Sequence, residues 1–316
     1  MKISFACTVF NEERNISTFL DSILDQSVKP EEIIIVDGGS KDKTVEIIRE
    51  YKRKSKIPIK LIVLPGANIA QGRNTYIKES KNDLLFSGDA GTRFERNWIK
   101  KLLKGFEKGA DVVVGGYYPE LQKKLIEKII ASRFPNFPKF SNRDWEAFIP
   151  SNRQIAYKLS SWNKLGKFPE QIERSDDTLL HMKAKKEGLK YYYAKDAKVY
   201  WRARENLREY LRLAYEDSVS DGEIGIVWKR KIYYLELAVL LSSIPFVFLS
   251  LFYKLPLFLI WCLGPLLLFL KEGLKIYKKI NDFKGFFYGG IVMNLLFFSH
   301  AIGALIGIVH RSLKKY

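Results

Sequence analysis

Apolar and polar positions follow two different rhythms along the N-terminal part of the chain. Short apolar runs predict buried strands, and they lie at Ile3–Phe10, Glu32–Val36, Ile59–Leu64, Asp83–Ser87 and Asp111–Gly115. Between them, apolar residues recur at helical spacing, in the segments 16–24, 44–51, 69–80 and 97–106. Strands that alternate with helices in this way predict βαβ units and an α/β fold with a mainly parallel sheet.

The middle of the chain has a weaker pattern. Phe134–Trp145 is rich in Pro and Asn and predicts a loop. Ser175–Glu187 predicts a helix that carries His181 on its surface. Tyr191–Tyr193 and Lys198–Trp201 predict two short strands.

Long apolar segments set the C-terminal part of the chain apart. They lie at Ile232–Tyr253, Leu255–Leu270 and Phe286–Val309, and we read them as candidate spans of a hydrocarbon core that is about 30 Å thick. We therefore expect an α/β domain over residues 1–228 and a membrane domain over residues 229–316. His300, inside the third segment, is expected to face other helices. Core helices of a soluble domain are the alternative, but three such runs in so short a stretch are hard to bury otherwise.

Basic residues flank these segments. Lys229–Lys231 precedes the first segment, and the connection Lys271–Lys284 contains five Lys against Glu272 and Asp282. The positive-inside rule places both on the cytoplasmic side, which predicts a multi-pass protein of the cell membrane with a cytoplasmic N-terminal domain. The tail 311–315 is also basic, and with three spans it would lie outside, against the rule. The number of spans therefore stays open.

The composition adds a net charge of +18. A basic protein is attracted to anionic membrane surfaces or to nucleic acid. No zinc-finger spacing, RNA-recognition signature or basic heptad helix is present, so membrane lipids are the expected partner and nucleic acid is not. Cys7 and Cys262 form neither a metal-binding spacing nor a disulfide framework. The N-terminal apolar run is short and leads into acidic residues, so we expect no signal peptide.

Polar residues follow three of the predicted strands. Ligands of open α/β sheets bind beyond the carboxyl ends of the strands, which draws attention to Asn11, Asp37 and Asp89. Asp37 begins an Asp-Gly-Gly-Ser sequence, which is good turn chemistry by itself. Its carboxylate is also placed to accept hydrogen bonds from a nucleobase or ribose, and Gly38 and Gly39 let a backbone approach a ligand closely. Both interpretations stay open at this point.

Four motifs, in order, resemble those of family 2 glycosyltransferases, which are enzymes of the GT-A fold. They are Thr8–Glu13, Ile34–Thr44, Gly72–Asn74 followed by Leu84–Gly91, and Ser175–Thr178. The resemblance covers about Lys2 to Trp201. It implies a GT-A domain that binds a UDP- or GDP-sugar, followed by C-terminal transmembrane helices.

The resemblance also assigns a nucleotide-sugar site. Its expected members are Phe10, Asn11, Glu12, Asp37, Gly38, Gly39, Arg73 and Asp89. Asp37 is read as a nucleotide contact. Arg73 suits a diphosphate or base contact, and its alternative is a surface salt bridge.

Asp89 matches the first carboxylate of the family's D-x-D motif, which holds Mg²⁺ or Mn²⁺ and neutralises the diphosphate leaving group. Gly91 stands where the second Asp is expected. Mg²⁺ commonly takes only one or two carboxylates together with substrate phosphates, so a divalent cation held by Asp89 and the diphosphate is expected. The alternatives are a cation such as Arg93 in part of this role, or a strand-end cap for Asp89.

Asp177 matches the catalytic base of the family, at the start of a predicted helix. An inverting transfer needs a carboxylate that takes the proton from the acceptor hydroxyl. Asp176 would orient Asp177 or raise its pKa through like charge. The alternative for both is helix N-capping.

These expectations predict an inverting glycosyltransferase that moves a sugar from a nucleotide-diphosphate donor to a lipid-linked or membrane-proximal glycan acceptor. A polyprenyl-phosphate sugar synthase is the nearest alternative. A catalytically inactive nucleotide-sugar-binding membrane protein is the alternative of another class, and Gly91 motivates it.

Overall fold

The computed structural model of the chain describes residues 1–120, 124–133, 150–172, 174–203, 206–229, 231–253 and 257–313. The loop predicted at Phe134–Trp145 lies outside the described residues. By their contacts, residues 1–120 and 135–202 form one compact unit, and residues 121–134 and 203–316 form a second. We call them the sheet unit and the helical unit. The domain boundary expected at residue 228 stays a prediction.

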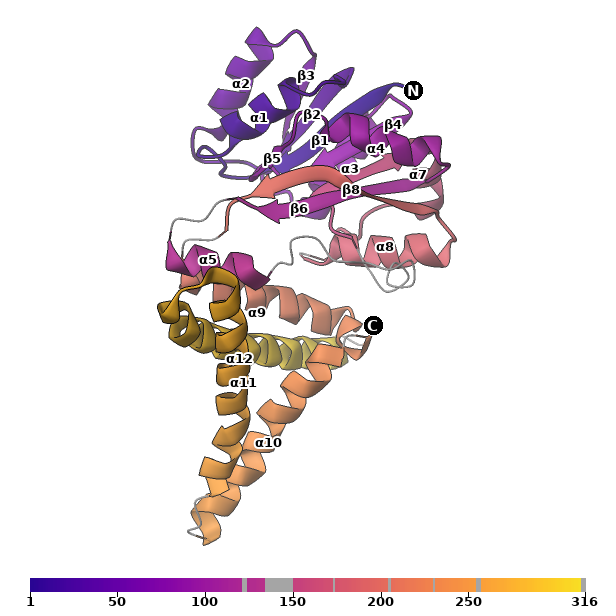
Figure 1. Cartoon of the computed structure of the whole chain (residues 1–316). Coiled ribbons are helices and arrows are strands. Elements are labelled where there is room, and N and C mark those ends of the chain that lie inside the picture. The colour runs from indigo at the N-terminus through magenta and orange to yellow at the C-terminus, as the bar shows by residue number, and fades with distance from the viewer. Residues whose placement is uncertain are drawn as a thin grey trace. The chain divides into compact units, whose positions relative to one another are not determined.

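The sheet unit is built on one eight-stranded sheet with the order β3-β2-β1-β4-β7-β6-β8-β5 (Figure 1). Its strands are β1 Ile3–Val9, β2 Glu32–Asp37, β3 Ile59–Val63, β4 Leu84–Gly88, β5 Thr92–Phe94, β6 Val112–Pro119, β7 Gln154–Lys158 and β8 Tyr191–Trp201. The five strands predicted in the N-terminal part are therefore confirmed within a few residues as β1, β2, β3, β4 and β6.

The pairing is parallel between β1 and β2, β2 and β3, β1 and β4, and β6 and β8. It is antiparallel where β7 lies between β4 and β6, and where β5 pairs with β8. The two strands predicted near residues 191 and 201 are wrong as separate elements. They form the single strand β8. Its pairing with β6 shifts register between Gly115 and Gly116, and this irregularity accommodates the residues between the two predicted strands.

Helices cover both faces of the sheet (Figure 1). They are α1 Ile16–Leu24, α2 Thr44–Lys54, α3 Ile69–Glu79, α4 Trp98–Glu107, α7 Leu159–Leu165 and α8 Asp176–Lys186. Helices α1, α2 and α4 share one hydrophobic core with alternate residues of β1 such as Phe5 and Cys7. The remaining alternate residues, Ala6 among them, face the cores that contain α3, α7 and α8. The period of two along a buried strand thus builds both layers.

The helical unit consists of α5 Leu125–Arg133, α9 Leu207–Glu223, the 3₁₀ turn η1 Ile226–Lys229, α10 Lys231–Tyr253, α11 Leu257–Ile280 and α12 Phe283–Leu313. The charged connection predicted at Lys271–Lys284 is wrong. Helix α11 continues through most of it, because Lys, Glu and Leu are strong helix formers and no proline interrupts them. Only residues 281–282 separate α11 from α12.

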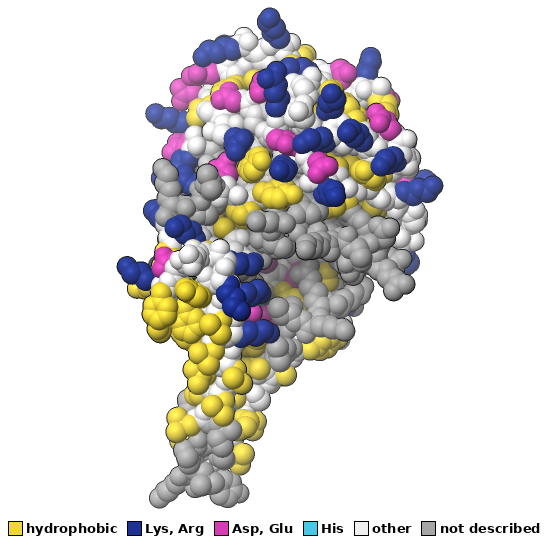
Figure 2. Space-filling view, viewed as in Figure 1, with side chains coloured by type: hydrophobic (Ala, Val, Ile, Leu, Met, Phe, Trp, Pro, Cys, Tyr) yellow, Lys and Arg dark blue, Asp and Glu magenta, His cyan; other side chains and the backbone are white. Residues whose placement is uncertain are grey.

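Among the described residues, one helix is long and apolar enough to cross a membrane, and it is α12, Phe283–Leu313. The expected multi-pass arrangement is therefore not supported: of the three candidate spans, only the third lies in such a helix within the described part of the chain. The apolar stretch of α10, Glu236–Phe252, is shorter than a membrane span. The second half of α11 carries four lysines, which are Lys271, Lys275, Lys278 and Lys279. Figure 2 shows hydrophobic side chains along the outer surfaces of α10 and α11, where Leu251, Phe252 and Leu259 are each more than 60 % exposed.

Helix α12 packs closely on α9 through glycines. A Cβ atom on Gly307 would lie 2.0 Å from the carbonyl oxygen of Val219, and one on Gly303 would lie 2.5 Å from that of Tyr215. Only glycine at these positions lets the two backbones approach so closely, as in the small-residue interfaces of membrane helices. His300 of α12 lies 3.4 Å from Glu236 of α10, so the expectation that it faces another helix is confirmed.

Candidate functional site

Asp37 is the last residue of β2, at the carboxyl end of that strand. The residue is completely buried. Its Oδ1 accepts hydrogen bonds from the backbone N–H groups of Gly39 (2.9 Å) and Ser40 (2.8 Å), and its Oδ2 accepts from the Ser40 hydroxyl (2.5 Å). Asp37 therefore shapes the Asp-Gly-Gly-Ser turn, which confirms the turn interpretation. Gly39 has φ +94°, a conformation that favours glycine. A nucleotide contact of Asp37 stays a prediction.

The loops that follow β1 and β2 are joined by hydrogen bonds. Asn11, which has φ +53°, donates its N–H to the Ser40 hydroxyl (2.8 Å) and accepts the N–H of Lys41 at Oδ1 (2.9 Å). The Glu12 N–H donates to Thr44 Oγ1 (2.7 Å). Phe10, which directly follows β1, is 57 % exposed. The structure thus brings the predicted residues of the first two motifs together at one edge of the sheet.

Asp89 directly follows β4, which is the parallel neighbour of β1. Its Oδ2 accepts a hydrogen bond from Arg153 Nε (3.1 Å), and the two side chains are 41 % and 45 % exposed. The sequence pattern did not reveal Arg153, because β7, which begins at the next residue, was not predicted. Arg93 is not the cation at Asp89: its Nε donates to Glu120 (3.0 Å) and its guanidinium lies over Tyr200, 4.7 Å from the ring centre.

The surroundings of Gly91 decide how a cation would be held. Among the described residues, no group of three or more His, Cys, Asp or Glu side chains is arranged to hold a metal ion. A Cβ atom on Gly91 would meet only Glu12 Oε1, at 4.0 Å. Burial, and then the negative charges of Asp89 and Glu12, raise the pKa of the neighbouring Cys7 thiol. Asp89 and Glu12 therefore offer carboxylate oxygens in one neighbourhood, which suits a hard cation that takes its other ligands from a diphosphate.

Helix α3 begins with a capping box and carries Arg73. Asn68 caps this helix: its side chain accepts from the N–H of Gln71, whose side chain accepts from the N–H of Asn68. Arg73 is 7 % exposed, and its Nη1 donates to Asp176 Oδ2 at 2.7 Å. The predicted alternative of a surface salt bridge is therefore wrong, because this pair is buried. A direct contact between Arg73 and a diphosphate stays a prediction.

Three carboxylates share the neighbourhood of Arg73. Burial lowers the pKa of Arg73, but attraction to Asp176, Asp177 and Asp89 outweighs it and raises the pKa above the usual range. Burial raises the pKa of Asp176, while Arg73 partly opposes that shift. The structure thus brings the predicted Asp89 together with the predicted pair Asp176 and Asp177, although almost 90 residues separate them in sequence.

Asp177 is half-buried at the start of α8. Its Oδ2 accepts the N–H of Asn152 (3.2 Å), and its Oδ1 accepts the N–H of Thr178 (2.7 Å). Asp176 and Asp177 both lie in the first helical turn, where negative charge is favourable. The N-cap position itself is Ser175, so neither Asp is the N-cap. Two backbone donors fix the direction of the Asp177 carboxylate.

A chain of buried hydrogen bonds lies behind Asp177. Asn152 donates from Nδ2 to the Tyr76 hydroxyl (3.0 Å) and accepts at Oδ1 from the Tyr157 hydroxyl (2.5 Å). The ring of His181 joins Tyr157 (3.2 Å) to Tyr191 (2.8 Å). His181 is completely buried, so its expected place on the helix surface is wrong. Burial lowers the pKa of His181 to about 4, which keeps the ring neutral.

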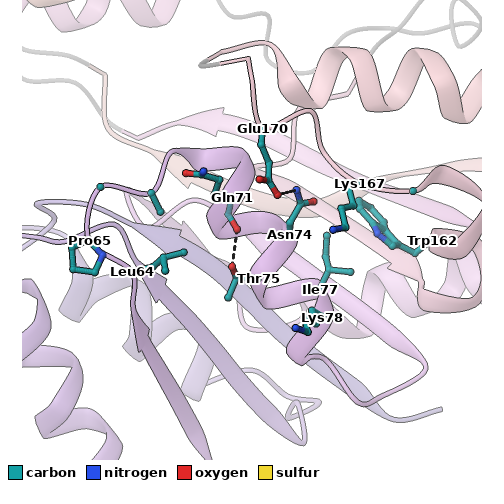
Figure 3. Close-up of a pocket in the computed structure, with 13 residues that line it drawn as sticks. Leu64, Pro65, Gln71, Asn74, Thr75, Ile77, Lys78, Trp162, Lys167 and Glu170 are labelled. Atoms are coloured by element: carbon teal, nitrogen blue, oxygen red, sulfur yellow. Dashed lines mark hydrogen bonds between the residues drawn. The ribbon is translucent and has the colours of Figure 1, made fainter.

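A cavity of about 710 Å³ lies next to this site (Figure 3). It is lined by the loop 64–67, by one face of α3 that includes Gln71 and Asn74, and by Glu170. Asn74 Nδ2 donates to Glu170 Oε1 at 2.7 Å. Arg73 projects from the other face of α3, and no predicted site residue is among the described residues that line the cavity. The predicted site therefore lies at the carboxyl ends of β1, β2 and β4 and not in this cavity.

Comparison with known proteins gives relatives at low identity. The chain is 27 % identical over 165 residues to the putative glycosyltransferase EpsH of Bacillus subtilis, a match that covers 52 % of this chain and 46 % of that protein. It is 28 % identical over 134 residues to the poly(ribitol-phosphate) beta-N-acetylglucosaminyltransferase TarP of Staphylococcus aureus, which covers 41 % of this chain and 40 % of TarP. The chain thus spans less than half the length of these curated relatives.

Solved structures share the fold. The mannosyltransferase PcManGT of Pyrobaculum calidifontis, in complex with GDP-Man and Mn²⁺, has a TM-score of 0.63 at 17 % identity, over 93 % of this chain and 87 % of that chain. S. aureus TarS 1–349 in complex with UDP-GlcNAc has a TM-score of 0.52 at 16 % identity, over 100 % of this chain and 93 % of that chain. The sheet unit accordingly has the GT-A fold, which confirms the fold expected from the motifs.

The family itself is established by sequence. Residues 4–166 match the model of glycosyl transferase family 2. This segment contains the predicted residues from Phe10 to Asp89 and extends through β7. Because the match takes in more than half of the chain, and because its fold is that of GT-A enzymes, the protein belongs to glycosyl transferase family 2.

Proposed function

We propose that this chain is an inverting glycosyltransferase that takes a sugar from a nucleoside-diphosphate donor. The observation that carries the proposal is that the consecutive residues Asn152 and Arg153 contact Asp177 and Asp89, while the buried Arg73 pairs with Asp176. It joins a candidate diphosphate-binding carboxylate to a candidate base. The neighbours were solved with UDP-GlcNAc and with GDP-Man, so both donor classes are retained.

Asp177 is the proposed catalytic base. Its carboxylate takes the proton of the acceptor hydroxyl while that oxygen attacks the anomeric carbon. The bond from this carbon to the diphosphate breaks, the nucleoside diphosphate leaves with the electron pair, and the configuration at the carbon inverts. Asp176 and Arg73 are positioning residues, because they hold the start of α8 through their 2.7 Å contact.

Asp37, with Phe10 and Asn11, is proposed to bind the nucleoside. Phe10 offers an exposed ring beside Gly38, whose Cβ would lie 3.5 Å from Phe10 Cδ2. A nucleobase would stack on the exposed face of this ring. When bound, a divalent cation such as Mg²⁺ or Mn²⁺ would neutralise charge on the leaving diphosphate. Asp89 is its proposed protein ligand, with Glu12 nearby.

The acceptor is proposed to be lipid-linked or to lie at the membrane surface. The support is α12, which is long and apolar enough to span a membrane, and the exposed apolar residues of α10 and α11. By the positive-inside rule, the lysines near the C-terminal end of α11 support a cytoplasmic position for that end. A cytoplasmic sheet unit on the inner face of the cell membrane follows as part of the proposal.

A transfer assay tests this proposal. The purified full-length chain in detergent is incubated with UDP- and GDP-sugars, with and without Mn²⁺, and with either polyprenyl phosphate or a lipid-linked saccharide. We expect a sugar-bearing lipid with one of the two acceptors. Asp89→Ala should lower the transfer rate at least 100-fold. The control Asp25→Ala, which changes an exposed Asp outside the site, should leave the transfer rate unchanged. Product with polyprenyl phosphate alone would identify a polyprenyl-phosphate sugar synthase. Nucleotide binding without product under any condition would identify an inactive binding protein.

A further inference from the structure

A second cavity, of about 250 Å³, lies within the helical unit between α5, α10, α11 and α12. We call it the helix cavity. The polar residues that line it are Ser132, Glu236, Glu272, Lys275, Lys279 and His300. Leu268 and Phe297 add apolar walls. The cavity has room for several water volumes of about 30 Å³ each, and hence for a small polar headgroup.

Lys275 and Lys279 line the helix cavity and are both exposed to solvent. They are four residues apart on α11 and therefore share one face of the helix. Lys275 lies 3.3 Å from Glu272, whereas Lys279 donates to the carbonyl oxygen of Ser132 and pairs with no carboxylate among the described residues. Burial, and then the positive charge of Lys275, lower the pKa of Lys279. An anion held between the two ammonium groups would relieve their repulsion.

Glu236 also lines the helix cavity. It is 2 % exposed, and its Oε1 is 3.4 Å from His300 Nδ1. Within the described part of the chain, its Oε2 has no hydrogen-bond partner. A buried carboxylate oxygen without a donor is costly, so the cavity presents an acceptor that a ligand hydroxyl would satisfy.

We propose that the helix cavity binds the phosphomonoester headgroup of a lipid. The non-protonated oxygens of such a group accept hydrogen bonds from Lys275 and Lys279, and its P–OH donates to Glu236. A phosphodiester has no such hydroxyl on phosphorus, so Glu236 selects against it. Helices α10 and α11, which contribute to the cavity lining, also carry exposed apolar residues that would contact the hydrocarbon chain. Basic pockets between apolar helices are suited to lipid phosphates.

The inference rests on the proposed function only for the contact between these helices and lipid, and it concerns binding alone. Native mass spectrometry of the full-length chain in detergent measures binding without sugar transfer. The probes are polyprenyl phosphate, phosphatidic acid, phosphatidylcholine and inorganic phosphate. We expect both lipid phosphomonoesters to bind at least ten-fold more tightly than phosphatidylcholine and inorganic phosphate. Failure of sugar transfer would leave this result unchanged.

Variants locate the binding. Lys275→Gln/Lys279→Gln is expected to lower the affinity for both phosphomonoesters at least ten-fold. The matched control Lys271→Gln/Lys278→Gln removes the same charge from exposed positions of α11 that do not line the cavity, and we expect wild-type binding. Glu236→Gln is expected to reduce the ratio between the affinity for the phosphomonoesters and the affinity for phosphatidylcholine. All variants should melt at the wild-type temperature.

Three results would overturn the proposal. They are equal binding of phosphatidylcholine by the wild type, equal loss in the two double variants, and the absence of phosphomonoester binding. Inorganic phosphate that binds as tightly as the lipids, with the same dependence on Lys275 and Lys279, would assign the cavity to free phosphate and overturn the lipid assignment.

Discussion

Arg73 of α3 and Asp176 of α8 form a buried ion pair with an Nη1–Oδ2 distance of 2.7 Å, across 103 residues of sequence. Arg73 also stacks on Phe168, with its guanidinium carbon 5.3 Å from the ring centre. The pair joins the third family motif to the fourth and holds the start of the helix that carries Asp177. We therefore propose that the pair positions Asp177.

Breaking this pair on one side should destabilise the fold. Arg73→Met leaves the buried Asp176 without a counter-ion, and removal of one partner of a buried pair typically costs about 3–5 kcal/mol. Arg73→Met/Asp176→Leu removes both charges and should lose clearly less than the sum of the single variants. Urea denaturation of the full-length chain measures the three free energies of unfolding. Additive losses in the double variant would show that the two side chains are not coupled.

Asp177→Asn should abolish most transfer while donor binding remains. The amide keeps the shape of the side chain but cannot take the acceptor proton, and loss of a general base typically lowers kcat by about 10²–10⁴-fold. Calorimetry of UDP and GDP binding should give the wild-type Kd. Asp25→Asn, at an exposed position beyond α1, serves as the matched control. Retained turnover in Asp177→Asn would remove Asp177 from its proposed role.

Gly91→Asp should strengthen metal binding. The position has room for a side chain, since a Cβ atom would meet nothing closer than Glu12 Oε1 at 4.0 Å. A second carboxylate next to Asp89 adds a hard oxygen ligand, and we expect Mn²⁺ affinity in the presence of UDP or GDP to rise about ten-fold. Gly91→Asn has the same shape without the charge and should change the affinity little. Titration followed by electron paramagnetic resonance reports free Mn²⁺, and equal affinities in both variants would contradict the expected placement of the metal.

Stability should fall in acid because of His181. Its pKa is lowered to about 4 by burial, below the value of about 6.5 in an unfolded chain. The contribution of His181 to the free energy of unfolding is therefore fully present above pH 6.5. It is lost as the pH falls toward 4, because the unfolded chain binds a proton that the folded chain does not. The free energy involved is on the order of 3 kcal/mol.

The test compares slopes of unfolding free energy against pH between 7 and 4. His181→Gln should have a shallower slope than the wild type, whatever its absolute stability. A wild-type slope in His181→Gln would show that the buried ring does not titrate with unfolding.

Local patterns were sufficient for the regular elements of the N-terminal part. Strands β1 to β4 and helices α1 to α4 follow from apolar runs and helical spacing within single segments. Strand β7 could not be predicted in the same way, because its place between β4 and β6 depends on pairing with distant strands. The segment predicted for α11 ends too early, at Leu270, because the lysines that follow are typical of the end of a membrane segment.

The same distinction between local patterns and distant contacts applies to the candidate site. Asp37, Asp89 and Asp177 stand in recognisable motifs, so their residue types and order were sufficient to select them. Asn152 and Arg153 stand in no such motif, and their contacts with Asp177 and Asp89 exist only because β7 is inserted beside β4. His181 looks like a surface residue in sequence because the tyrosines that enclose it come from β7 and β8.

Inverting transfer is the central claim, and the anomeric configuration of the product tests it most directly. The full-length chain is supplied with an α-linked UDP- or GDP-sugar, Mn²⁺ and the acceptor that supports turnover. Proton NMR then reports the new linkage from its anomeric coupling or carbon–hydrogen coupling. Direct displacement assisted by Asp177 predicts a β-linked product. An α-linked product, or no sugar-bearing product from any donor, would contradict it.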